Sequence, residues 1–206
     1  MARTPNTQER RKQIVLALQQ VMAKQGYDGS SIQDIGAAAG LAPGLVHYHF
    51  KTKQEILLAL LEHLVDLQSE RVRLALEGTS GVDALDHFID AHLALGRSAD
   101  PEALACWIAL SGEAIRQPEV GAAFGQALAT FRGHLLTILR EGTTSGAFQC
   151  EAPEAAASAI FAAIQGYYAL AATVRTLIPK GSAAPAVRTM ARALVLPTKA
   201  PARRAR

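Results

Sequence analysis

The sequence predicts an all-α fold with two parts, a three-helix N-terminal unit and a larger C-terminal helical bundle. Half of the 206 residues are hydrophobic, and alanine, leucine and other strong helix formers dominate the chain. Valine, isoleucine and threonine rarely alternate with polar residues at a spacing of two, so we expect no β-sheet. Glycine, proline and capping residues divide the chain into segments of helix length.

The N-terminal part contains three predicted helices, which span residues 7–25, 32–39 and 43–50. Gly26 follows the last apolar residue of the first segment and predicts its C-terminal end. Ser31 with Asp34 three residues later is a capping pattern that begins the second helix, and Gly40 ends it. Pro43 is tolerated in a first helical turn and begins the third helix. The first 50 residues therefore have the dimensions of a helix-turn-helix.

The rest of the chain contains longer predicted helices, which span residues 52–76, 82–97, 100–116, 118–141, 151–178 and 185–196. Thr52 with Glu55 forms a capping box at the start of the first of them. Gly142 is the expected end of the segment that begins at Pro118. The alanine-rich segment 151–178 is almost uncharged, so we expect it to be buried on several sides.

The charged residues are distributed unevenly, although the formal net charge is only +3. Residues 1–53 carry seven basic and three acidic residues, whereas residues 54–196 carry ten basic and fifteen acidic residues. The last ten residues carry four basic residues and no acidic one. This asymmetry is expected for a nucleic-acid-facing end attached to a body that avoids phosphate, and a solvated surface alone can also produce it.

Several features favour a cytoplasmic protein. No uninterrupted apolar run reaches the roughly 18 residues expected of a membrane span. The charged stretch that follows the N-terminus lacks the apolar core of an export signal. Cys106 and Cys150 are too isolated for a disulfide framework or a zinc site.

The motifs of common enzyme classes are missing from the sequence. We find no Gly-x-Ser-x-Gly, no His-Glu-x-x-His and no phosphate-binding glycine loop. His47 and His49 are two positions apart, which does not place them on one helix face for a metal ion. We therefore predict no catalytic residues, no metal site and no cofactor.

The third helix has one face for packing and one face for recognition. Ala42, Val46 and Phe50 are spaced four residues apart and must pack against the preceding helix. The opposite face consists of small residues followed by polar ones, which can approach a DNA groove and hydrogen-bond to bases or phosphates. Leu45 can touch a thymine methyl group. Lys53 stands in the first turn of the next helix, where its charge and the free N–H groups favour a phosphate oxygen.

Three segments, SSIQDIGAAAGL (30–41), HYHFKTK (47–53) and EIL (55–57), resemble the N-terminal signature of TetR-family regulators. The resemblance covers about residues 10–60. It implies a helix-turn-helix domain over 1–55 and a ligand-binding and dimerisation domain over 56–196. The proline, lysine and arginine content of residues 197–206 predicts a basic, disordered tail. The predicted DNA-binding residues are Ser31, Pro43, Gly44, Leu45, His47, Tyr48, His49 and Lys53.

His47 departs from the commoner aromatic residue at its position in the family. We expect either an altered base preference or DNA binding that depends on pH, which operator titrations at about pH 6 and about pH 8 would separate. The alternative for His47, Tyr48 and His49 is that they form only the polar side of a short helix.

The resemblance also implies an effector pocket formed by the middle helices and a homodimer interface formed by the last two long helices. The candidate ligand-binding residues are Phe88, His92, Trp107, Leu110, Phe124, Leu128 and Phe131, where the few aromatic residues cluster. His92, Glu113, Arg116 and His134 can orient a polar ligand group. We expect a hydrophobic or amphipathic organic effector. The small residues of segment 151–178 suit either a close dimer contact or a central core helix.

The resemblance therefore predicts a ligand-responsive repressor that binds palindromic double-stranded operator DNA as a homodimer. An adaptor protein, whose first 50 residues contact another protein instead of DNA, is the main alternative. Retention on heparin with a steep salt dependence would distinguish the two. Membrane attachment through the basic tail is a third and weaker interpretation, because no lipid-inserting helix adjoins it.

Overall fold

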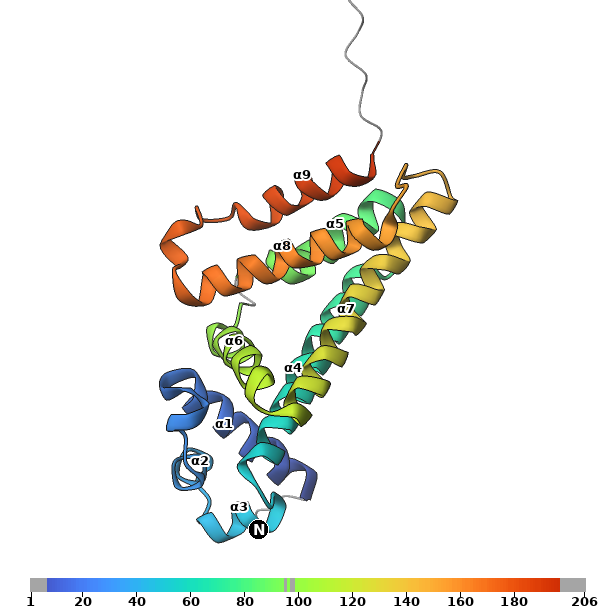
Figure 1. The fold of residues 1–206 in the computed structure, drawn as a ribbon. Helices are drawn as coiled ribbons and strands as arrows, with labels where there is room; N and C mark the ends of the chain where they lie inside the picture. The colour runs from blue at the N-terminus through green and yellow to red at the C-terminus, as the bar shows by residue number, and fades with distance from the viewer. Residues whose placement is uncertain (1–6, 95, 97–98, 197–206) are drawn as a thin grey trace, which may run out of the picture. The chain divides into compact units, whose positions relative to one another are not determined.

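The computed structural model describes residues 7–94, 96 and 99–196, and the described part contains helices and no strand (Figure 1). The predicted all-α fold is therefore confirmed. The chain divides into two compact units, Met1–Leu67 with Ser98–Leu128, and Gln68–Arg97 with Ala129–Arg206. Two long helices, α4 (Lys53–Leu76) and α7 (Pro118–Thr144), contribute residues to both units. The expected basic tail, 197–206, lies outside the described residues.

Unit 1 is built on α1, which packs against α2, α3 and α6. Its helices are α1 (Thr7–Gly29), α2 (Ile32–Ala39), α3 (Pro43–His49) and α6 (Pro101–Arg116), with the first part of α4 and of α7. Ile14, Leu18, Ile35, Phe50 and Leu57 are fully buried in its core. The helical spacing of these apolar residues along α1, α2 and α4 places them on inward faces.

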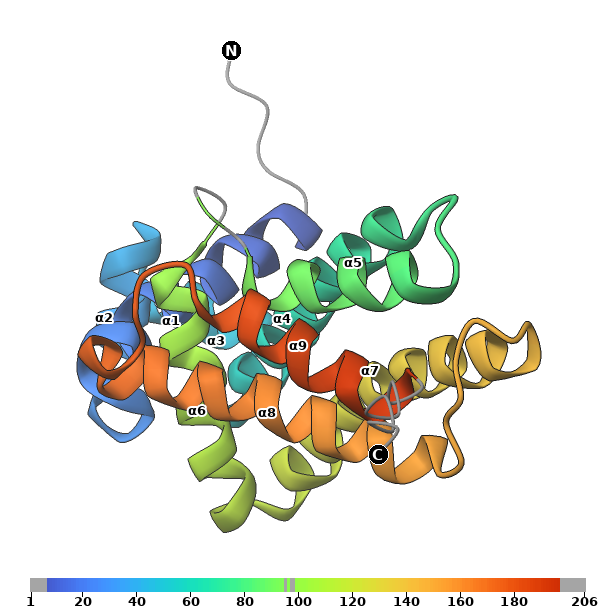
Figure 2. The ribbon, with the colours of Figure 1, turned by 90° about the horizontal axis from the view of Figure 1, so that it is seen from above.

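Unit 2 contains α5, α8 and α9, with the remaining parts of α4 and α7. Its further elements are α5 (Gly81–Leu93), α8 (Pro153–Thr173), the short 3₁₀ helix η2 (Arg175–Leu177) and α9 (Ala183–Val195). Helix α9 packs on both α5 and α8 and lies between them in Figure 2. Arg188 forms a bidentate ion pair with Asp90 at 2.5 and 2.6 Å, and Arg192 pairs with Asp86, which ties α9 to α5.

Most helix starts lie within two residues of the expected positions, whereas several ends differ. Gly26 interrupts α1 with a left-handed φ of 75°, as expected for a stop, but helical structure resumes to Gly29. The end predicted at Gly142 is wrong, because α7 continues to Thr144. A Cβ at Gly142 would overlap the ring of Phe148, so this glycine allows a close side-chain approach instead of ending the helix.

Two further helices end earlier than predicted. Helix α5 ends at Leu93, with Ala94 as its C-cap. Helix α8 ends at Thr173 and is followed by η2, whereas a continuous helix to residue 178 was expected. Thr173 and Val174 are both β-branched, and such residues favour helices less than the alanines before them.

Candidate nucleic-acid interface and effector site

The turn between α2 and α3 depends on two glycines. Gly40 has a left-handed φ of 64° and ends α2 by donating its N–H to the Ala37 carbonyl. A Cβ at Gly36 would lie 2.9 Å from the backbone oxygen of Leu41. Only glycine therefore lets the chain return this closely against α2, which fixes where α3 begins.

Helix α3 separates a packing face from an open face. The expected packing of Ala42 is wrong, because this residue precedes the helix and is exposed. Val46 and Phe50 are fully buried. Tyr48 is 71% exposed and Leu45 is 38% exposed. The remaining predicted contact residues of α3 are exposed or half-buried: Pro43, Gly44, His47 and His49. The structure thus brings these side chains together on one accessible surface, which we call the α3 face (Pro43, Gly44, Leu45, His47, Tyr48 and His49).

Two side chains of α1 support the helix-turn-helix from behind. Arg11 donates a hydrogen bond to the carbonyl of His49 at 2.5 Å, and its guanidinium lies 3.9 Å from the centre of the Phe50 ring. Gln13 donates to the carbonyl of Ala39 at 2.6 Å. The C-terminal carbonyls of α2 and α3 thus receive partners that a short helix cannot supply itself. Sequence reasoning noted the basic run at Arg11 but missed this supporting role.

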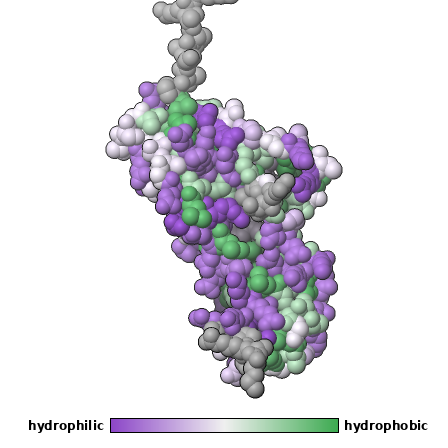
Figure 3. Space-filling model, turned by 180° about the vertical axis from the view of Figure 1, so that it is seen from behind, coloured by the Kyte–Doolittle hydropathy of each residue, from purple (hydrophilic) through white to green (hydrophobic). Residues whose placement is uncertain are grey.

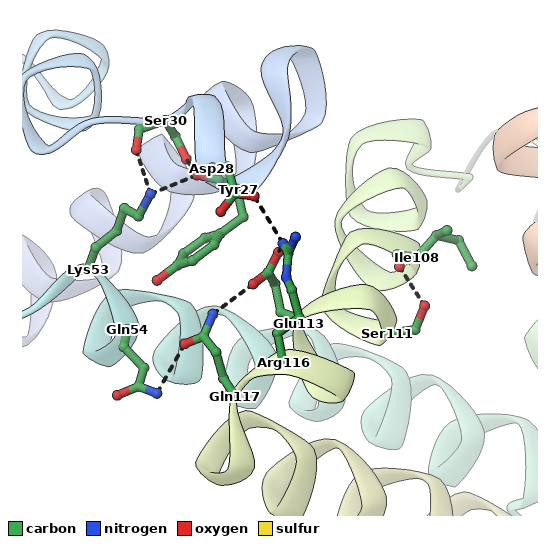
Figure 4. A network of polar contacts seen from close by, with 10 residues as sticks. All are labelled: Tyr27, Asp28, Ser30, Lys53, Gln54, Ile108, Ser111, Glu113, Arg116 and Gln117. Carbon is green, nitrogen blue, oxygen red and sulfur yellow. Dashed lines mark hydrogen bonds and ion pairs between the residues drawn. The ribbon is translucent and has the colours of Figure 1, made fainter.

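The two predicted phosphate-contacting residues outside α3 have partners within the protein. The Ser31 hydroxyl accepts the Asp34 N–H at 3.1 Å, while the Asp34 carboxylate accepts the Ser31 N–H at 2.9 Å. The Ser31 hydroxyl also donates to the Asp34 carboxylate at 2.6 Å, and this hydrogen bond, together with the one from the Ser31 N–H, holds the pKa of Asp34 below its usual value. The Lys53 ammonium donates to the carbonyls of Tyr27 and Ser30 at 2.8 and 2.9 Å (Figure 4). DNA contacts by Ser31 and Lys53 remain predictions.

A polar network centred on Glu113 joins α1, α4 and α6 and includes Gln117, which lies between α6 and α7 (Figure 4). Glu113 is only 4% exposed and accepts hydrogen bonds from Arg116 and, at 2.7 Å, from Gln117. Gln54 donates to the Gln117 side chain at 3.0 Å, and Arg116 reaches Asp28 at 3.1 Å. Glu113 and Arg116 were expected to orient a ligand, and here they link the end of α6 to α1 through Asp28 and to α4 through Gln117.

Three of the candidate ligand-binding residues lie together in unit 2. The rings of Phe88 and His92 have centres 4.6 Å apart, and the centre of Phe131 is 5.8 Å from that of His92. All three side chains are at most 2% exposed. Burial, together with the charges of Arg71 and His134, lowers the pKa of His92 to about 3.

The other four candidates belong to unit 1. Trp107 and Phe124 pack with ring centres 4.8 Å apart, Leu110 is fully buried, and Leu128 is half-buried. A surface groove of about 570 Å³ in this unit is lined by residues of 25–28 and 108–116 and includes none of the seven candidates. Ligand contact by either group remains a prediction.

Family models match most of the chain. Residues 14–60 match the model described as "Bacterial regulatory proteins, tetR family". Residues 81–196 match the model described as "BetI-type transcriptional repressor, C-terminal". The body of the chain, which the motif resemblance did not reach, is therefore assigned as well.

Curated relatives align over part of their length. The chain is 30% identical over 112 residues to the HTH-type transcriptional regulator BetI of Rhizobium meliloti (strain 1021), covering 54% of this chain and 55% of the relative. It is 35% identical over 72 residues to the transcriptional activator FasR of Mycolicibacterium smegmatis, covering 35% of this chain and 33% of the relative. The chain thus spans about half, or less, of the length of these relatives.

Solved structures share the fold over almost the whole chain. A transcriptional regulator from Rhodococcus sp. Rha1 aligns with a TM-score of 0.79 at 23% identity, covering 89% of this chain and 95% of that one. A regulator from Saccharomonospora viridis, solved in complex with choline, aligns with a TM-score of 0.77 at 21% identity, covering 90% and 95%. At these identities the likeness establishes the fold.

Proposed function

Because this chain belongs to the TetR family of transcriptional regulators, we propose that it is a ligand-responsive repressor. In this proposal it binds a palindromic operator as a homodimer and leaves the DNA when a small hydrophobic or amphipathic effector binds. The match of residues 81–196 to a BetI-type repressor model supports repression over activation. The relative named as an activator aligns over only a third of the chain.

The single observation that carries the proposal is the α3 face. A buried side supported by Val46 and Phe50 leaves the opposite side of a seven-residue helix accessible, with small residues first and polar residues after them. Such a helix can enter the major groove, which is wide enough to admit it. Arg11 fixes the C-terminal end of α3, so the readout side chains are presented by a helix with a defined position.

The proposed dimer interface is the outward side of α8 and α9. Small residues recur on α8 at spacings of three and four, and all of them are exposed: Ala155, Ala159, Ala162, Gly166 and Ala169. Leu170, Met190 and Leu194 are also exposed on these helices. Small residues let two helices approach closely, so a second copy can cover this surface through an isologous contact. By contrast, the face in Figure 3 is mainly hydrophilic, with small separate hydrophobic patches.

Helix α8 is the one described helix that is long and apolar enough to cross a membrane, by length and composition. One such helix is weak evidence, since a core helix of a soluble protein passes the same test. Only 28% of the most apolar 18-residue stretch of α8 is buried within the chain. One copy therefore does not give this helix the burial on several sides that the sequence predicted. We propose that the dimer supplies the remaining cover and that the protein acts in the cytoplasm, without enzymatic activity.

The proposed mechanism acts through the spacing of the two α3 helices in the dimer. Two half-sites one turn apart require recognition helices separated by roughly 34–36 Å. Effector binding would shift α4, which begins three residues after the last buried residue of the helix-turn-helix, and so change this spacing. The Glu113 network, which connects the end of α6 and Gln117 to Gln54 of α4, is a route by which such a shift can reach the DNA-binding helices.

The test is selection of bound fragments from a random double-stranded DNA pool with the purified, full-length protein at near-physiological salt. We expect a palindrome, and affinity for it that falls steeply as salt increases. Recovery of no sequence above background from folded, ligand-free protein, with no salt-dependent retention on heparin, would instead favour an adaptor that contacts protein.

A further inference from the structure

A partly buried polar cluster in unit 2 joins α4, α5 and α8, and His92 is its buried member. Arg71 donates to the Gln68 side-chain oxygen at 2.6 Å, which directs the Gln68 amide nitrogen toward His92. That nitrogen lies 3.0 Å from Nδ1 of His92. The Tyr168 hydroxyl lies 2.9 Å from the same Nδ1 and 3.3 Å from the His92 carbonyl oxygen. An amide nitrogen can only donate, so Nδ1 of His92 is the acceptor.

This arrangement fixes the tautomer of His92. Burial, and after it the neighbouring Arg71 and His134 side chains, lower the pKa of His92, so the imidazole is neutral near pH 7. Since Nδ1 accepts, the single ring proton is on Nε2. Nε2 is buried and has no hydrogen-bond partner among the residues that the structure describes. An unpaired buried donor is costly, and native proteins rarely keep one without a purpose.

A second unpaired ring nitrogen lies nearby on α7. Nδ1 of His134 is also buried and lacks a partner within the described part of the chain. His134 is close enough for its charge to act on His92. One helical turn earlier, Phe131 packs edge-on against the His92 ring, and Phe88 packs on it from α5. Two unmatched ring nitrogens therefore belong to histidines that lie close to buried aromatic rings.

The electrostatic surroundings of this cluster are basic. The titratable side chains that act on His92 are Arg71 and His134, and both disfavour a positive charge on its ring. Carboxylates of the same unit have other partners: Asp90 pairs with Arg188, Asp86 pairs with Arg192, and Glu70 pairs with Arg73. Such surroundings favour a ligand group that is negatively charged and can accept hydrogen bonds. A quaternary ammonium ion is positively charged and has no hydrogen-bond acceptor.

We propose that His92 and His134 bind the carboxylate of an amphipathic effector, whose apolar part packs against Phe88 and Phe131. One carboxylate oxygen accepts from Nε2–H of His92, and the other accepts from His134 in the tautomer protonated on Nδ1. Arg71 offsets the ligand's charge, while Gln68 and Tyr168 hold the His92 ring in place. This inference rests on the proposed effector response and specifies the ligand class, in contrast to the choline bound by one structural neighbour.

The test compares three probes that share one apolar body and differ in the head group: 4-phenylbutyrate, 4-phenylbutanamide and 4-phenylbutyltrimethylammonium. Calorimetry with the full-length protein should show the carboxylate binding at least about tenfold more tightly than the amide, and no binding of the ammonium probe. In a ¹⁵N-histidine NMR spectrum, the carboxylate should shift the Nε2 signal of His92.

Variants locate the binding. His92→Phe should lower carboxylate affinity about tenfold or more. If that variant does not fold, His134→Leu carries the test, because the His134 Nδ1 has no partner to lose, and we expect a similar loss. His87→Leu, at an exposed position of α5, is the matched control and should bind like the wild type. Failure of the carboxylate to bind, equal binding of the ammonium probe, or wild-type affinity in His134→Leu would overturn the proposal.

A separate measurement of operator binding distinguishes a failure of this site from a failure of the proposed function. Carboxylate binding that requires His134 but leaves operator affinity unchanged would support the site and contradict its role as the effector switch. Operator release by a probe that binds equally well to His134→Leu would support the switch and contradict this site.

Discussion

At the scale of single residues, the two faces of α3 predict opposite mutational effects. Phe50 is fully buried beneath Arg11, so Phe50→Ala should destabilise the protein by roughly 3–5 kcal/mol through the cavity that it leaves. His47 is exposed, so His47→Ala should change the free energy of unfolding by less than about 0.5 kcal/mol while weakening operator binding. Urea denaturation and fluorescence anisotropy measure the two quantities, and wild-type operator affinity in His47→Ala would remove His47 from the readout.

His92 predicts how stability depends on pH. Its pKa is about 3 in the folded protein and 6.5 in the reference state, so between these values the unfolded chain binds more protons than the folded one. Stability should therefore fall as the pH decreases through this window, and His92 alone should cost about 2 kcal/mol at about pH 5.

The check is urea denaturation of the wild type and of His92→Phe between about pH 7 and about pH 5. The variant should lose less stability than the wild type over this range, because it lacks the proton uptake that Arg71 and His134 oppose. His87→Gln serves as the control for removal of an exposed histidine on the same helix. Equal slopes for the wild type and His92→Phe would show that His92 is not neutralised by burial.

At the scale of elements, α2 depends on its N-terminal cap. Ser31→Ala removes the acceptor of the Asp34 N–H and should cost about 1 kcal/mol of folding free energy. Ser31→Asn keeps a capping oxygen and should retain near wild-type stability. If Ser31→Asn unfolds like the wild type but binds operator more weakly, the hydroxyl also contacts DNA. If both variants are equally destabilised, the cap is not what the Ser31 side chain contributes.

The elements also show what local sequence can predict. Helix α2 was predicted with its observed bounds because Ser31, Asp34 and Gly40 act within the helix itself. The end of α7 was not predicted correctly. Gly142 is required there because the ring of Phe148, in the following loop, packs closely against it. The α3 face followed from the spacing of Val46 and Phe50, whereas Arg11 depends on His49, 38 positions away, and the Glu113 network includes the Arg116–Asp28 pair, 88 positions apart. Tertiary packing decides which of these residues meet, and the periodicity of a single helix does not predict it.

At the scale of the whole molecule, the exposed face of α8 requires a second copy in the proposed function. Ala162 lies midway along the exposed row of small residues. Ala162→Arg should place a charge where two helices approach closely, so the chain should sediment as a monomer at concentrations where the wild type is a dimer. A monomer reaches only one half-site at a time, so operator affinity should fall at least about tenfold.

The control for this variant is His87→Arg, which adds the same charge at an exposed position of α5. It should keep the oligomeric state of the wild type. Circular dichroism and urea denaturation of Ala162→Arg should show a folded chain, because Ala162 is exposed in the single copy. A folded Ala162→Arg protein that sediments as a dimer and binds operator normally would exclude α8 from the interface. The exposed row of small residues would then need another partner, since one copy buries only 28% of the most apolar 18-residue stretch of α8.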